Sequence, residues 1–419
     1  MIPEHKIEGN HLRDTKLFAK YLANFSEPEI ASLAGFPESL QFSHVVVVPS
    51  YKESLDFVTR FNLLNPGEQT ALLIAVINQP DTDSVKQPQQ QLADDIKASA
   101  TCLWQNNNLS LLQLTNGGYV LLVDRFNQAI PHKQGVGLAR KIGADLACQL
   151  IATGQILSPW IRSTDADAHL PDNYFAALPQ SCVDSSAIIF DFFHQSDNAQ
   201  EDAANRIYEQ SMRYYVAGLR FAGSPYSFYT IGSILAFSAE AYVKARGFPK
   251  RAAGEDFYLL NKVAKLGNIT SQPSVQIKID ARVSDRVPFG TGPMVQKIIA
   301  LQTDNKEYFY YQPQVFVELK RLLDAVSHCK GNLTELIQAL ESFSDLTRQS
   351  LTDIGFFTFI NNPQLQSSSA QQVSKQLMVW FDAFKTLKFI HALRDNGLPD
   401  MPLSEALNNP FFSIHPEDK

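Results

Sequence analysis

Short apolar runs that alternate with helical segments constrain this chain more than any other feature. The first run, Val45–Val48, is β-branched throughout and ends at Pro49, and an alanine-rich helical segment covers 135–151. Buried parallel strands have this continuous apolar character, and the helices between them cover both faces of the sheet. We therefore predict an α/β fold with a mainly parallel sheet and with ligands beyond the carboxyl ends of its strands. Further runs of strand length lie at 72–77, 119–123, 160–163 and 187–192.

The two ends of the chain have a different, helical character. After about residue 300 apolar side chains recur at helical spacing, and Leu17, Tyr21 and Leu22 do so near the N-terminus. We predict an N-terminal helical extension over 1–40, the α/β domain over 41–300 and a helical C-terminal region over 301–419. Two polar stretches are interpreted as irregular structure. The glutamine-rich residues 87–91 read as a solvated loop, and 367–369 read as a linker.

Composition excludes several classes of function. The chain has 419 residues and a net charge of -7, so it lacks the basic face that binds nucleic acid. Its four cysteines form no C-x-x-C pair, which argues against a zinc ribbon or a redox dithiol. The N-terminus has no apolar h-region, and no run approaches the ~18 to 20 apolar residues of a membrane span. We expect a cytoplasmic protein without a transmembrane segment, and a peripheral contact with a membrane stays open.

An acidic pair follows the apolar run at 160–163. Asp165 and Asp167 are separated by one residue at the expected end of a strand. Two carboxylates at one point suit Mg²⁺ or Mn²⁺, which usually also binds phosphates and water. Such a cation would neutralise charge that develops on a departing diphosphate. Taken alone, a solvated turn explains the tripeptide better, because Asp is common in turns.

A second acidic pair opens a helix. Glu255 and Asp256 precede an apolar stripe that ends at Gly267. Acids in a first turn stabilise a helix by about 0.3 to 1 kcal/mol, which is the structural explanation. The functional one makes one carboxylate the general base that accepts a proton from an acceptor hydroxyl.

A third segment, 135–147, combines glycines with Arg140 at the start of a helix. Arg140 would meet either a phosphate or a strand-end acid. The glycines would allow a close approach to a ligand or close packing of the helix on the sheet. The dinucleotide-binding fingerprint is incomplete here, which disfavours an NAD site.

Together these segments resemble the family 2 glycosyltransferases, which have the GT-A fold. The opening strand with P-x-Y-x-E at Pro49, Tyr51 and Glu53, the G-x-x-x-A-R-x-x-G helix, the D-x-D and the later acidic motif occur in the family's order. The resemblance covers about residues 44–290. It implies a hexosyltransferase-like enzyme that moves a sugar from a UDP- or GDP-sugar donor to the hydroxyl of a small or lipid-linked acceptor. It also implies inversion and dependence on Mn²⁺ or Mg²⁺.

The resemblance also assigns roles to individual residues. Pro49, Tyr51 and Glu53 would line the nucleoside pocket. Asp165 would contact ribose or metal, and Asp167 would bind the metal. Asp256 would be the catalytic base, assisted or oriented by Glu255. Arg282 and Arg286 would clamp the diphosphate, although solvated surface charge explains them equally well.

The sequence departs from the family at several points. Asn78 stands near the place where a base-reading Asp often occurs, so the identity of the base stays open. The Q-x-x-R-W motif is absent, which argues against polymer synthesis coupled to export. His169 and His194 read as polar loop residues, with His194 the better acceptor-site candidate. Three alternatives remain: a retaining enzyme for a small acid, a non-catalytic nucleotide- or carbohydrate-binding homologue, and a nucleotidyltransferase, which the segment after Val48 disfavours.

Overall fold

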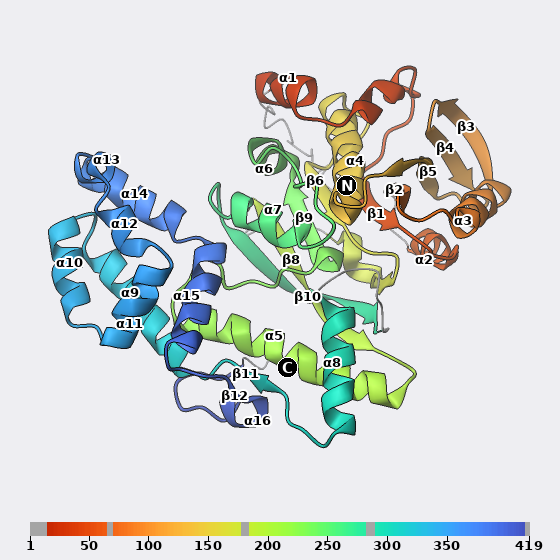
Figure 1. The fold of residues 1–419 in the computed structure, drawn as a ribbon. Helices are drawn as coiled ribbons and strands as arrows, with labels where there is room; N and C mark the ends of the chain where they lie inside the picture. The colour runs from red at the N-terminus through yellow and green to blue at the C-terminus, as the bar shows by residue number, and fades with distance from the viewer. Residues whose placement is uncertain (1–14, 65–69, 177–183, 282–289, 415–419) are drawn as a thin grey trace, which may run out of the picture. The chain divides into compact units, whose positions relative to one another are not determined.

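The chain forms two compact units in the computed structural model, which describes residues 15–64, 70–176, 184–281 and 290–414. The first unit comprises Met1–Ile188 with Gly232–Thr270, and the second comprises Ile189–Ile231 with Ser271–Lys419 (Figure 1). These units divide the chain at other positions than the predicted boundaries at 40 and 300. None of the described helices combines the length and the apolar character that crossing a membrane requires.

The first unit is built on a mainly parallel core of strands. Neighbouring strands follow the order β3-β4-β5-β2-β1-β6-β9. The pairs β5–β2, β2–β1 and β1–β6 are parallel, while β3–β4, β4–β5 and β6–β9 are antiparallel. The predicted α/β fold with a mainly parallel sheet is therefore confirmed. The strands are β1 His44–Ser50, β2 Ala71–Pro80, β3 Ala100–Asn106, β4 Leu109–Leu114, β5 Tyr119–Ile130, β6 Trp160–Ser163 and β9 Leu235–Ser238, and β7 Ala168–His169 follows β6.

Helices cover both faces of this sheet. Successive side chains of β1 point to opposite faces, so β1 contacts a different helix on each face. Val47 faces α4 (Gly135–Ala152), and a Cβ on Gly143 of that helix would overlap its methyl group. Val46 and Val48 line a cavity together with side chains of α2 (Asp56–Leu63). The remaining helices of the unit are α1 Thr15–Asn24, η1 Pro28–Leu33, α3 Gln87–Ala98, η2 Asp172–Phe175, η4 Gly232–Ile234, α6 Ala239–Lys244 and α7 Glu255–Val263.

The loop predicted at 87–91 is wrong, because these residues form the start of α3. Pro88 occupies the first turn, where its missing N–H costs nothing. Leu92 and Ile96 are buried one turn apart and hold the helix against the rest of the unit. Packing of this short apolar stripe outweighs the polar character of the glutamines.

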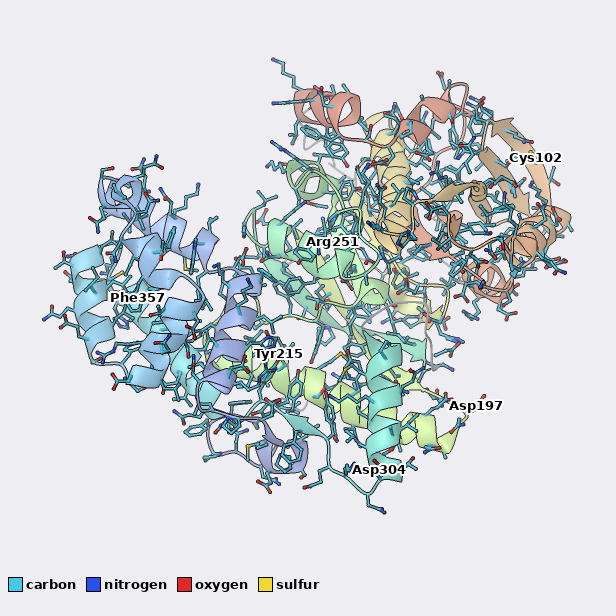
Figure 2. All side chains as sticks on the ribbon, viewed as in Figure 1. Cys102, Asp197, Tyr215, Arg251, Asp304 and Phe357 are labelled. Carbon is cyan, nitrogen blue, oxygen red and sulfur yellow. The ribbon has the colours of Figure 1, made fainter. Side chains whose placement is uncertain are left out.

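The second unit is mainly helical and has its own apolar core. Most of β8 (Ala187–Gln195) and of β10 (Ile269–Asp280) belongs to it. Its core joins α5 (Ala199–Phe221) to helices from the C-terminal region, and Figure 2 labels two partly buried residues that pack against this core, Tyr215 and Phe357. The predicted linker at 367–369 is a turn, and Ser369 caps the next helix. The other elements are α8 Thr291–Thr303, β11 Phe309–Tyr310, α9 Gln314–His328, α10 Leu333–Glu341, α11 Asp345–Asp353, α12 Phe356–Ile360, α13 Pro363–Gln366, α14 Ala370–Trp380, α15 Ala383–Asp395, β12 Met401–Pro402 and α16 Leu403–Ala406.

Candidate active site

A buried arginine connects the two acidic pairs of the sequence. Arg140 of α4 is 2% exposed, and all three nitrogens of its guanidinium donate hydrogen bonds to protein oxygens. Its Nε lies 2.7 Å from Glu255 Oε1, and its Nη2 lies 2.5 Å from Asp165 Oδ1. Of the two partners that the sequence left open for Arg140, the structure therefore shows the strand-end acid.

The end of β6 supplies further partners for the same guanidinium. Nη1 donates to Ser163 Oγ at 2.8 Å and to the Thr164 carbonyl at 3.3 Å. Burial lowers the pKa of Arg140, but the carboxylates of Asp165 and Glu255 raise it more, so the net shift is upward. Arg140 is therefore a permanent cation that links α4, the end of β6 and the start of α7.

Ser233 holds the second oxygen of Asp165. Its hydroxyl donates to Asp165 Oδ2 at 2.5 Å, while Thr164 Oγ1 donates to the Ser233 carbonyl at 2.8 Å. The neighbouring Gly232 has no room for a side chain, because a Cβ there would overlap Nη2 of Arg140. The turn η4 thus presses against the arginine and fixes the orientation of the Asp165 carboxylate.

Glu255 and Asp256 open α7 in different environments. Glu255 is 4% exposed and paired with Arg140, whereas Asp256 is only partly buried. Burial and the neighbouring Glu255 carboxylate raise the pKa of Asp256 to about 7, against the opposing charge of Arg140. The Asp256 carboxylate also accepts a hydrogen bond from the Phe257 N–H at 2.6 Å. A carboxyl group with a pKa near neutrality can both accept and release a proton at physiological pH.

The acids fit a divalent cation only in part. Each oxygen of Asp165 accepts one hydrogen bond, so Arg140 and Ser233 orient the carboxylate, and one lone pair stays available on each oxygen. No three His, Cys, Asp or Glu side chains gather as a metal-binding group within the described residues. Asp167 lies partly exposed in the loop between β6 and β7. One carboxylate together with substrate phosphates and waters is a normal ligand set for Mg²⁺, and Asp167 fits that set.

Tyr51 lies just beyond β1 and is held by a partner that the sequence did not suggest. Its hydroxyl donates to Asp83 Oδ2 at 2.5 Å, and Lys52 Nζ lies 2.9 Å from the same oxygen. The hydrogen bond from Tyr51, the Val85 N–H and Lys52 together lower the pKa of Asp83 to about 2. Asp83 therefore stays ionised and fixes the tyrosine ring at the carboxyl end of the sheet.

Asn78 lies on the neighbouring strand β2, within the same edge of the sheet. It is 6% exposed, and its Oδ1 has no hydrogen-bond partner among the described residues. The register pairs Ser50 of β1 with Ile77, so the next residues along the two strands are Tyr51 and Asn78. Parallel strands place such residues on one face of the sheet.

The other predicted site residues are placed as follows. Pro49 is buried in β1, and Glu53 is partly exposed in the loop before α2. Arg282 and Arg286 lie outside the described residues. His169 is in β7, and His194 is in the second unit, where its Nδ1 lies 3.2 Å from Glu209 Oε2.

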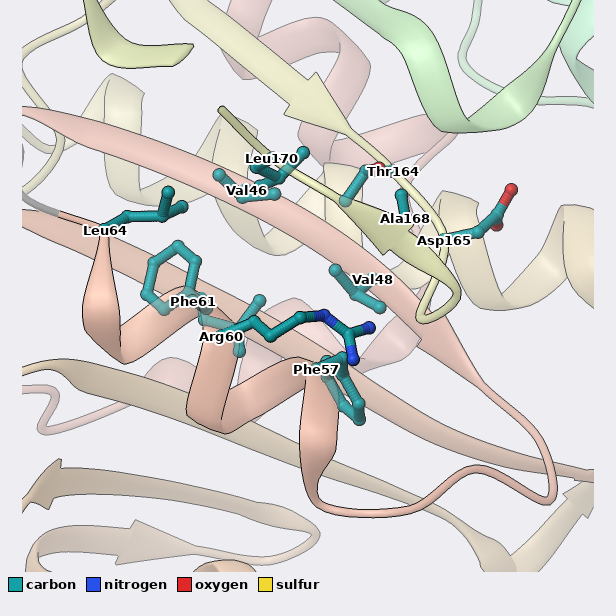
Figure 3. A pocket seen from close by; sticks show the side chains of 11 residues that line it. Val46, Val48, Phe57, Arg60, Phe61, Leu64, Thr164, Asp165, Ala168 and Leu170 are labelled. Atoms are coloured by element: carbon teal, nitrogen blue, oxygen red, sulfur yellow. The ribbon is translucent and has the colours of Figure 1, made fainter. Parts of the chain in front are cut away.

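A small cavity lies on the opposite side of β1 from α4 (Figure 3). Its volume is about 20 Å³, which leaves room for about one water molecule and not for a nucleotide. Arg60 reaches over it from α2, and its Nη2 donates to the Ala166 carbonyl at 2.7 Å. This bond steadies the loop that carries Asp165 and Asp167.

Sequence reasoning missed Ser163, Thr164, Gly232, Ser233, Asp83 and Arg60. Their signals were weak. Ser163 and Thr164 directly precede the acidic pair, and the Gly-Ser dipeptide at 232–233 interrupts an aromatic-rich stretch. Nothing in the sequence pointed to Asp83 or Arg60.

Comparisons with known proteins give distant likenesses only. No protein-family model matches the chain, and no curated protein matches it either. Among solved structures it is similar to TarS 1-349 of S. aureus in complex with UDP-GlcNAc, at 12% identity over 84% of this chain and 90% of that chain, with a TM-score of 0.38.

Two further solved structures show a similar degree of likeness. The mannosyltransferase PcManGT from Pyrobaculum calidifontis, in complex with GDP-Man and Mn²⁺, is 13% identical over 89% of this chain and 95% of that chain, with a TM-score of 0.33. GalNAc-T7 with UDP, GalNAc and Mn²⁺ is 13% identical over 87% of this chain and 59% of that chain, with a TM-score of 0.36. At these values the likeness identifies neither a donor nor a metal for this chain.

Proposed function

We propose that the chain is a GT-A glycosyltransferase that uses a nucleotide-diphosphate sugar as donor. The observation that carries this proposal is Arg140, which joins the acid after β6 to the acid pair that opens α7. Two motifs far apart in the sequence thereby share one site beyond the carboxyl ends of parallel strands. Ligands of open α/β sheets bind at that edge.

Asp256 is the proposed general base. With a pKa of about 7, it accepts the proton of an acceptor hydroxyl without being permanently protonated. The hydroxyl oxygen then forms a bond to the anomeric carbon, and the bond from that carbon to the diphosphate breaks with its electron pair. Direct displacement of this kind inverts the anomeric configuration.

Glu255 and Asp165 have positioning roles in this proposal. Both are paired with Arg140, so they fix α7 and the loop after β6 relative to each other. Asp167 would hold a Mn²⁺ or Mg²⁺ ion together with the donor diphosphate. Such an ion neutralises the negative charge that develops on the leaving diphosphate.

The nucleoside would lie at the edge formed by β1 and β2. Tyr51 offers a ring that Asp83 holds in place, and Asn78 offers a buried amide with an unpaired oxygen. An amide offers N–H donors and a carbonyl acceptor, so it can pair with the donor–acceptor edge of a nucleobase without selecting one base. The resemblance of the motifs to family 2 supports a UDP- or GDP-sugar as the donor in this proposal and a small or lipid-linked alcohol as the acceptor.

The test is a panel of UDP- and GDP-sugars titrated into the full chain by calorimetry, with and without Mn²⁺. We expect one nucleotide-sugar to bind with an affinity that depends on the metal. Asp167→Ala should remove the metal dependence, while Asp165→Asn should retain it. Absence of binding by every member of the panel would contradict the proposal.

The second measurement concerns the base. Asp256→Asn should lower turnover by about 10²- to 10⁴-fold, the usual contribution of a general base. Donor affinity should stay close to that of the wild-type chain, because Asp256 is assigned to the acceptor side. An equal loss of donor binding and turnover would assign Asp256 to the structure of α7 instead.

A further inference from the structure

The corner between α14 and α15 in the second unit exposes an unusual set of side chains. Met378 and Val379 are each 44% exposed at the end of α14, and Phe384 is 37% exposed in the first turn of α15. Lys375 precedes Met378 and Val379 by three and four residues, so the three share one face of the helix. We refer to residues 375–388 as the basic corner.

The basic corner is positively charged within an acidic protein. The chain has 43 acidic residues against 36 Lys and Arg, yet Asp382 is the single acid between residues 354 and 394. Its Oδ1 accepts hydrogen bonds from the N–H groups of Phe384 and Lys385, both at 3.1 Å, and so caps α15. Residues 375–388 therefore carry three lysines against one acid.

These lysines lie against the aromatic rings of the corner. Lys388 Nζ lies 4.7 Å from the centre of the Phe384 ring, and Lys385 Nζ lies 4.2 Å from that of Trp380. Lys375 and Lys388 are exposed, and neither forms an ion pair with any described residue. Their long side chains can turn outward without displacing the exposed apolar groups of the corner.

We propose that the basic corner docks the protein onto an anionic lipid surface. Membrane-surface helices combine Lys with exposed apolar and aromatic residues, and polybasic segments bind anionic headgroups. Interfaces between proteins are depleted in Lys, so a protein partner fits this composition less well. The proposal rests on the second unit alone and stands or falls independently of the proposed transferase activity.

The experiment is co-sedimentation of the full chain with vesicles of phosphatidylcholine alone or with phosphatidylglycerol added. We expect binding to the anionic vesicles that decreases as the salt concentration rises. Lys375→Gln with Lys388→Gln should weaken binding about 25-fold, since each lysine contributes roughly fivefold. The matched control is Lys306→Gln with Lys330→Gln, which removes the same charge elsewhere and should change binding little.

A second pair tests the apolar part of the corner without changing charge. Met378→Ser with Val379→Ser should weaken binding roughly tenfold. Ile337→Ser is its control, at an apolar side chain outside the corner that is 37% exposed. Equal binding to both kinds of vesicle would overturn the proposal, as would corner variants that bind like their controls. A chain that dimerises, and stops doing so with the same substitutions, would assign the corner to a second copy instead.

Discussion

At the scale of single residues, the site is organised by one buried charge. Arg140 has no access to solvent that would compensate for a lost partner, and its two carboxylates lie at 2.5 and 2.7 Å. Removal of one member of a buried ion pair leaves the other member desolvated and uncompensated. The network is therefore a stronger constraint on the fold of the site than any single hydrogen bond in it.

This leads to a prediction about Arg140→Met. The substitution should lower the free energy of unfolding by about 3–5 kcal/mol, because Glu255 then stays buried without a counter-charge. Glu255→Gln introduced together with Arg140→Met should recover part of that loss, which urea unfolding of the two single variants and the double variant would measure. Additive losses in this double-mutant cycle would show that the two side chains do not interact.

The raised pKa of Asp256 predicts how stability depends on pH. In the unfolded chain the pKa is about 4, whereas burial and Glu255 raise it to about 7 in the folded chain. The folded state therefore binds this proton more tightly, and this group makes the protein less stable as pH rises from 4 to 7. Asp256→Asn removes the effect. The free energy of unfolding of the variant relative to wild type should rise across this window and level off above it.

Thermal or urea unfolding at pH 4, 5, 6, 7 and 8 would test this. Asp172→Asn, at an exposed acid in η2, serves as the control and should show no such trend. A flat difference between Asp256→Asn and wild type would mean that the carboxyl group has an ordinary pKa.

The sequence identified some residues of this network and missed others. Arg140, Asp165, Glu255 and Asp256 were identified because each belongs to a short pattern with a chemical reason behind it. Ser233 was not, because its hydrogen bond to Asp165 spans 68 residues and depends on how η4 leads into β9. A hydroxyl that acts as a support has no local signature, since Ser is equally common in solvated turns.

At the scale of elements, apolar runs placed β1, β2, β5, β6 and β8, whereas β3, β4, β9 and β10 were not predicted. The four valines at 45–48 gave β1, and the short run at 160–163 gave β6 with its observed bounds. The polar composition of 87–91 led to the wrong prediction of a loop, because burial of Leu92 and Ile96 stabilises α3. Composition reports on solvent exposure, and one buried face of a helix requires few apolar residues.

The close packing of α4 on β1 gives a prediction at this scale. Ala normally stabilises a helix interior over Gly by about 1 kcal/mol. At Gly143 we expect the opposite sign, because a Cβ there would overlap Val47 Cγ1. Gly143→Ala should cost about 1–3 kcal/mol through overpacking.

Combining Gly143→Ala with Val47→Ala in one chain tests this packing explanation. Val47→Ala removes the Val47 methyl group that the new Cβ would overlap most, although Val76 Cγ2 stays at 3.3 Å, so Gly143→Ala should cost less in this background than in the wild type. Denaturant unfolding of the four chains measures the coupling. A stabilising Gly143→Ala in the wild-type background would contradict the packing explanation for this glycine.

At the scale of the whole molecule, neither compact unit is a single continuous stretch of the chain. Segment 189–231 lies inside the predicted α/β domain, yet it belongs to the second unit. Its helix α5 contributes Tyr214 and Leu219 to a core that is otherwise made by residues after 290. Local periodicity cannot reveal this arrangement, because it shows which face of α5 is apolar but not which partner covers that face.

Removal of residues 301–419 therefore has a predictable result. If the boundary predicted at 300 were a real domain boundary, the remaining chain would fold and stay soluble. The structure leads us to expect the opposite, because the cut removes α9, whose Phe316 ring packs directly against Gly218 of α5. The apolar face of α5 would then be exposed, and such faces cause aggregation. Dye binding, sedimentation and circular dichroism of the truncated chain measure this. A monomeric chain 1–300 that unfolds cooperatively would show that α5 does not need the C-terminal helices to fold.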